Sequence, residues 1–132
     1  MLVPNVQWKS WAINTEESHA AAVFVLVGVP IWLAGEIGNG AAHLALRDQK
    51  GPRSWPKGAM FSHVSCPHYL FEIISWIGWA VVTGVNITAA PVVYAVVASA
   101  ILVSYGLERH WAYQRKYKDY PVGRKAVVPF VV

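Results

Sequence analysis

The sequence has 132 residues, of which 55% are hydrophobic and only 14% are charged, and its mean hydropathy is +0.37. This composition is too apolar for an ordinary small soluble domain and favours a single membrane domain. The formal net charge is +4, and the charged residues lie between apolar stretches. This distribution favours positively charged membrane loops over nucleic-acid binding. The only cysteine is Cys66, so an intrachain disulfide and a multi-cysteine metal site are excluded, and we expect no metal.

Three apolar stretches divide the chain into successive parts, because about 20 apolar residues are needed to cross a bilayer. In chain order, the predicted parts are a polar lead-in (1–18), transmembrane spans over 19–46, 69–87 and 90–107, and a basic, aromatic C-terminal segment (108–132). The predicted fold class is therefore all-α. We expect an integral membrane helical bundle of about three transmembrane helices that forms one domain over 1–132.

The positive charges predict how the spans are oriented. Ten of the eleven Lys and Arg residues lie in 47–57 and 109–125. Two predicted crossings separate these basic segments, so both should lie on the same side of the membrane. By the positive-inside rule, that side is the cytosolic or matrix side.

Polar and aromatic residues recur at helical spacing inside two of the predicted spans. Those that share a face in the first span are Glu36, Asn39, His43 and Arg47. Those that share a face in the second span are Tyr69, Glu72, Trp76, Trp79 and Thr83. Lipid would penalise the polar groups, so these faces should turn toward each other, a cavity or a partner protein. A packing network and a binding site fit this pattern equally well.

Three motifs follow one another in the C-terminal three quarters of the sequence. They are 37–39 (Ile-Gly-Asn) with 43–48 (His-Leu-Ala-Leu-Arg-Asp), 65–72 (Ser-Cys-Pro-His-Tyr-Leu-Phe-Glu) with Trp76 and Gly78, and 110–121 (His-Trp-Ala-Tyr-Gln-Arg-Lys-Tyr-Lys-Asp-Tyr-Pro) with Arg124, Pro129 and Phe130. Together they resemble the steroid 5α-reductase family, and most closely the trans-2-enoyl-CoA reductases of very-long-chain fatty-acid elongation. The resemblance covers roughly residues 30–132.

The resemblance implies specific roles for individual residues. The residues that it implies as NADPH ligands are Asn39, His43, Arg47, Glu72, His110, Tyr113 and Arg124. It implies Tyr69 as the catalytic acid that protonates the substrate after hydride transfer, with Glu72 as its catalytic neighbour. Arginines suit the phosphates of a dinucleotide, and a tyrosine can donate a proton in a dry site if a neighbour orients it.

The 132 residues contain no counterpart of the family's N-terminal half, which supplies the other wall of the substrate cavity. Because three helices cannot enclose both a dinucleotide and an acyl chain, we expect a non-catalytic accessory subunit of a larger membrane assembly, for example a mitochondrial respiratory complex. Its expected partners are other membrane subunits and membrane lipids, not nucleic acid, and it would need no cofactor. The alternative is an NADPH-dependent trans-2-enoyl-CoA or steroid-type double-bond reductase completed by another chain. The mitochondrial inner membrane and the endoplasmic reticulum are the two candidate locations.

Overall fold

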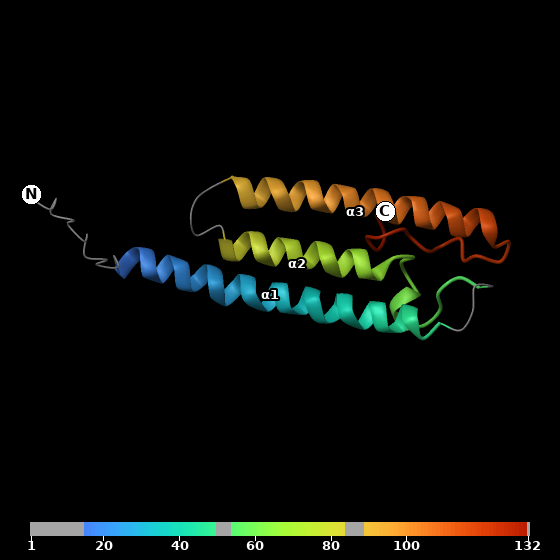
Figure 1. Cartoon of the computed structure of the whole chain (residues 1–132), viewed down its shortest axis with the longest axis horizontal. Helices are drawn as coiled ribbons and strands as arrows, with labels where there is room; N and C mark the ends of the chain where they lie inside the picture. Colours follow the sequence, from blue (N-terminus) through green and yellow to red (C-terminus); the bar gives the residue numbers. More distant parts are fainter. Residues whose placement is uncertain (1–14, 50–53, 84–88, 132) are drawn as a thin grey trace, which may run out of the picture.

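The computed structural model of the chain describes residues 15–49, 54–83 and 89–131. The described part is all-α, as predicted. It contains the long helices α1 (Thr15–Arg47), α2 (Pro67–Thr83) and α3 (Ala90–Lys116) and one 3₁₀ turn, η1 (Ala59–Phe61). The three long helices run side by side with α2 between the other two, and α1 and α3 end at the same end of the molecule (Figure 1). Both basic segments therefore start from one end of the helix layer.

The helix ends differ from the predicted spans. α3 continues to Lys116, nine residues beyond the predicted end at 107. The prediction ended early because the last turns of α3 carry charged residues, although their backbone is helical. Hydropathy marks where a helix leaves an apolar environment, whereas the backbone pattern continues until its hydrogen bonding ends. The predicted lead-in up to residue 14 and the end of the second span, residues 84–87, lie outside the described residues.

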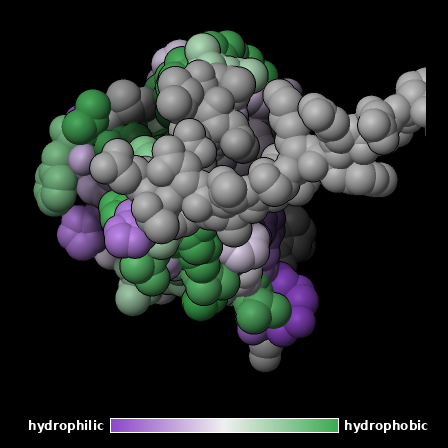
Figure 2. All heavy atoms as spheres, turned by 90° about the vertical axis from the view of Figure 1, so that its left-hand side faces the viewer, coloured by the Kyte–Doolittle hydropathy of each residue, from purple (hydrophilic) through white to green (hydrophobic). Residues whose placement is uncertain are grey.

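Two of the helices are long and apolar enough to cross a membrane. They are Ala21–Arg47 and Ala90–Lys116, and only 11% and 17% of their most apolar windows are buried inside the molecule. A helix of a soluble core would bury most of such a window, so these exposed apolar surfaces favour contact with lipid. Hydrophobic side chains also reach the surface on several sides of the end opposite the basic segments (Figure 2). α2 has 17 residues and is shorter than a typical span.

Glycines allow α1 and α2 to approach each other closely. A Cβ atom added to Gly28 would lie 2.9 Å from the carbonyl oxygen of Gly78, and one added to Gly35 would lie 2.5 Å from the backbone nitrogen of Ser75. Both distances are far below a normal van der Waals contact. Small residues at a helix interface let the backbones pack directly, which is a main source of helix association in membranes.

The C-terminal segment, 117–131, turns back from the end of α3 and pairs with the stretch that precedes α2 (Figure 1). Lys125 N–H donates to the His63 carbonyl oxygen (2.9 Å), and Ser65 N–H donates to the Lys125 carbonyl oxygen (2.8 Å). Val127 is fully buried and packs against Gly106 of α3, where a Cβ atom would overlap its side chain. A small buried core therefore lies at the basic end of the molecule.

The glycine contact predicts opposite effects for two alanine substitutions in α1. Gly35→Ala should destabilise the protein by about 1–3 kcal/mol, because the new Cβ meets backbone atoms of α2 that cannot move aside. Gly40→Ala is the matched control, since nothing lies within 4 Å of its Cβ position. It should be neutral or stabilising by up to about 1 kcal/mol through helix propensity. Thermal unfolding in detergent, followed by circular dichroism, measures both; equal stability of the two variants would contradict the packing described.

Candidate reductase site

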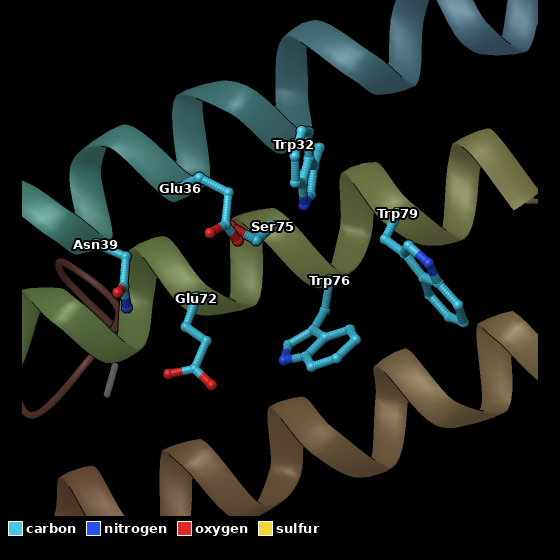
Figure 3. A pocket seen from close by; sticks show the side chains of 7 residues that line it. All are labelled: Trp32, Glu36, Asn39, Glu72, Ser75, Trp76 and Trp79. Atoms are coloured by element: carbon cyan, nitrogen blue, oxygen red, sulfur yellow. The ribbon is translucent and has the colours of Figure 1, made fainter.

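A pocket of about 440 Å³, lined by both polar and aromatic side chains, lies between α1 and α2. Its lining residues are Trp32, Glu36 and Asn39 from α1 and Glu72, Ser75, Trp76 and Trp79 from α2 (Figure 3). The pocket thus brings together part of each polar face predicted from helical spacing. The other members of those faces do not line it: His43, Arg47, Tyr69 and Thr83. The Ser75 hydroxyl is buried and has no hydrogen-bond partner among the described residues. A buried hydroxyl without a partner costs free energy, which favours a polar occupant of this pocket.

A second, smaller pocket surrounds the predicted catalytic tyrosine. It has a volume of about 200 Å³ and is lined by Leu46, Cys66, His68, Tyr69, Arg109 and Tyr113. Arg109 and Tyr69 line this pocket together, so the guanidinium lies near the Tyr69 hydroxyl. A cation in this position stabilises the phenolate that forms when a tyrosine gives up its proton. Tyr69 and Glu72 are one turn apart on α2, yet they line different pockets.

Three of the predicted cofactor ligands lie near the end of α1. Asn39 donates its Nδ2–H to the His68 carbonyl oxygen (2.9 Å), and the His43 ring lies 5.2 Å from the His68 ring. Both residues therefore connect α1 to the first turn of α2. Arg47 lies at the surface, with 71% of its side chain exposed, and donates its Nε–H to Asp48 (3.0 Å).

His110 belongs to a buried network centred on the Ser65 hydroxyl. The Ser65 Oγ lies 2.6 Å from His110 Nδ1, 2.5 Å from the Tyr120 hydroxyl and 2.9 Å from the Lys125 carbonyl oxygen. A hydroxyl has one proton and two lone pairs, so Ser65 donates to Lys125 and accepts from the other two groups. This assigns the proton of a neutral His110 to Nδ1, and its Nε2 accepts from the Gln114 amide (2.8 Å).

Arg124 is also used inside the fold. It is only 7% exposed, its Nη1 donates to the Pro56 carbonyl oxygen (3.1 Å), and its guanidinium lies 5.3 Å from the Tyr120 ring centroid. His110 and Arg124 therefore hold the C-terminal segment in place and line neither pocket. The sequence analysis missed Arg109 as a site residue and counted it only within the basic segment 109–125. The signal was its i, i+4 spacing from Tyr113, which places both side chains on one face of α3.

Comparison with known proteins agrees with these motifs. Residues 3–132 match the family described as 3-oxo-5-alpha-steroid 4-dehydrogenase. The chain belongs to the steroid 5α-reductase family. The resemblance predicted from the three motifs is thereby confirmed, and the two apolar spans make the chain a membrane protein of this reductase family.

Curated relatives in this family carry two kinds of name. The very-long-chain enoyl-CoA reductase of Dictyostelium discoideum is 33% identical over 82% of this chain and 37% of its own length. The steroid 5-alpha-reductase DET2 of Solanum lycopersicum is 36% identical over 95% of this chain and 49% of its own length. The 3-oxo-5-alpha-steroid 4-dehydrogenase 1 of Rattus norvegicus is 31% identical over 81% and 42%. The chain spans less than half the length of these relatives.

We expect that removal of the Ser65 hydroxyl frees the C-terminal segment, because this hydroxyl is the centre of the network. Ser65→Ala leaves the Tyr120 and His110 donors buried without an acceptor, at about 1–3 kcal/mol for each group. Tryptic cleavage within 117–125 should accelerate while the helices stay intact. Ser104→Ala is the control, because the Ser104 hydroxyl is exposed and bonds only to its own helix, at Ala100. Equal cleavage rates in both variants would show that the network does not hold the segment.

Cys66 should be unreactive in the folded protein. Burial raises the pKa of its thiol to about 12, and the nearby Arg109 only partly opposes this shift. Because the thiolate is the reactive form, alkylation near neutral pH should be about three thousandfold slower than in the unfolded chain, where the thiol pKa is near 8.5. Maleimide incorporation followed by intact mass, with and without dodecyl sulfate, measures the ratio. Rapid labelling of the folded protein would contradict the burial of Cys66.

Proposed function

We propose that this chain supplies the proton donor of an NADPH-dependent reductase that saturates a carbon–carbon double bond conjugated to a carbonyl group. The observation that carries the proposal is the Tyr69 hydroxyl beside Arg109 in a pocket of a reductase-family membrane protein. The names of the relatives support two substrate classes, trans-2-enoyl thioesters and 3-oxo steroids, which share a conjugated carbonyl. Both classes need the same two events, a hydride addition and a protonation.

Tyr69 performs the protonation in this proposal. NADPH, when bound, supplies the hydride to the alkene carbon farther from the carbonyl. The Tyr69 hydroxyl donates its proton to the carbon next to the carbonyl and becomes a phenolate. Arg109 stabilises this phenolate until a solvent proton restores the hydroxyl.

The residues present fit one side of a cofactor site. Arg109 provides a cation for an anionic group, and the unpartnered Ser75 hydroxyl and the Asn39 amide provide polar contacts in the neighbouring pocket. The two pockets, of about 200 and 440 Å³, are too small to enclose a dinucleotide and a substrate together. Further residues, from this protein or from a partner, therefore complete the site in this proposal.

A second candidate function is that of a non-catalytic accessory subunit in a larger membrane assembly. It is favoured by the structural use of two motif residues: His110 and Arg124 are 8% and 7% exposed and hold the C-terminal segment. Motif residues would then persist because the fold needs them, and NADPH would not be a cofactor. Its partners would be other membrane subunits and lipids, in the mitochondrial inner membrane or the endoplasmic reticulum.

Tyr69→Phe separates the two functions. If Tyr69 is the acid, NADPH oxidation with a trans-2-enoyl-CoA or a conjugated 3-oxo steroid should slow about 10²–10⁴-fold. The native protein, extracted with its partners, is assayed beside Tyr105→Phe, a control whose ring is exposed on α3 and lines neither pocket. Activity that is absent from the native protein, or equal in both variants, would favour the accessory function.

A further inference from the structure

Lysines and aromatic rings form a compact cluster at the basic end of the molecule. We call Trp55, Lys57, Lys116, Tyr117 and Lys118 the basic–aromatic rim. The Lys57 ammonium lies 4.9 Å from the centroid of the Trp55 ring, and the Lys116 ammonium lies 5.3 Å from the centroid of the Tyr117 ring. The Trp55 and Tyr117 rings are themselves 5.6 Å apart. The rim therefore joins the loop after α1 to the end of α3.

The loop that carries Lys57 is held in place against the end of α1. The Gln49 amide donates to the Lys57 carbonyl oxygen (2.8 Å) and accepts from the Lys57 N–H (3.2 Å). Because a side-chain amide makes both backbone bonds, the position of Lys57 does not depend on its ammonium group. That group remains available for another ligand.

The rim lysines have no acidic partner within the part of the chain that the structure describes. The ion pair found there joins Arg47 to Asp48, and no described carboxylate lies within 4.0 Å of the three rim ammonium groups. A cation over an aromatic ring gains about 0.5–1 kcal/mol at an exposed site and keeps most of its N–H donors free. The rim thus presents three positive charges that form no ion pair with a described carboxylate.

A recess of about 260 Å³ adjoins the rim. Gln114, Tyr117, Lys118, Tyr120 and Val122 line it. Val122 is 94% exposed, which places an apolar side chain at the edge of a basic, polar recess. This combination lies where the two apolar spans, α1 and α3, end together (Figure 1). Tyr and Trp rings with Lys side chains are typical of the boundary between bilayer and water.

We propose that the basic–aromatic rim binds the headgroup of an anionic phospholipid. The phosphate lies in the recess beside Lys118, Lys57 and Lys116 complete its charge neutralisation, and Val122 contacts the apolar boundary of the bilayer. A soluble phosphate would use the three lysines equally well. The exposed Val122 and the position at the ends of the spans favour a lipid as the occupant.

Native mass spectrometry of the protein in nanodiscs tests this proposal. With equal amounts of phosphatidylcholine and phosphatidylglycerol, the released protein should retain phosphatidylglycerol preferentially. Each rim lysine near an anionic surface should account for about a fivefold preference. Lys118→Gln should therefore lower the enrichment about fivefold, and the triple variant Lys57→Gln, Lys116→Gln, Lys118→Gln should abolish it.

Lys125→Gln is the matched control, because it removes the same charge from an exposed residue outside the rim and the recess. It should leave the enrichment unchanged. The proposal is overturned if the native protein retains both lipids equally, or if Lys125→Gln lowers the enrichment as much as Lys118→Gln. It is also overturned in favour of a soluble ligand if inorganic pyrophosphate displaces the retained phosphatidylglycerol. Circular dichroism of each variant verifies that the helices are intact.

Discussion

The close approach of α1 and α2 is the contact on which the rest of this structure depends. In a membrane, lipid tails solvate apolar side chains as well as protein does, so helices associate mainly through direct packing of their backbones. Gly28, Gly35 and Gly78 provide that packing, because each position leaves no room for a Cβ atom. The resulting register places Glu36 and Asn39 of α1 and Glu72 of α2 around one pocket, of about 440 Å³.

A second constraint fixes the entrance of α2. The C-terminal segment bonds to Ser65 and Cys66, and the Cys66 carbonyl oxygen in turn accepts the Tyr69 N–H (3.1 Å). The C-terminal segment therefore positions Tyr69 through two successive backbone hydrogen bonds, both made by Cys66. Gly106 leaves room for the Val127 side chain to pack against α3. Arg109 lies about one turn further along α3 and lines the same pocket as Tyr69. The pairing of the C-terminal segment with the stretch before α2 thus helps to form the pocket that contains Tyr69 and Arg109.

The sequence predicted the parts of this arrangement that depend on local periodicity. Three helices and the two polar faces followed from apolar runs and from spacings of three and four residues, and the structure brings Asn39 and Glu72 to one pocket as those faces implied. Roles that depend on tertiary approach could not be predicted in this way. The bonds of His110 to Ser65 and of Arg124 to Pro56 span 45 and 68 residues, so no local pattern distinguishes a motif residue that binds a ligand from one that holds a segment. For Arg109, the i, i+4 spacing gave a local link to Tyr113, but only the packing of α3 on α2 places Arg109 near Tyr69.

Binding of NADPH to the native protein in nanodiscs is the most direct test of the proposed site. Energy transfer from tryptophan to the bound nicotinamide can follow it, since Trp32, Trp76 and Trp79 line the larger pocket. Saturable binding is expected, and Arg109→Ala should weaken it about ten- to a hundredfold through loss of a charged contact. Arg115→Ala, which removes an exposed charge from the same helix outside both pockets, should leave it unchanged. A native protein that does not bind NADPH, or two arginine variants that bind it as tightly as the native protein, would contradict the proposed reductase site.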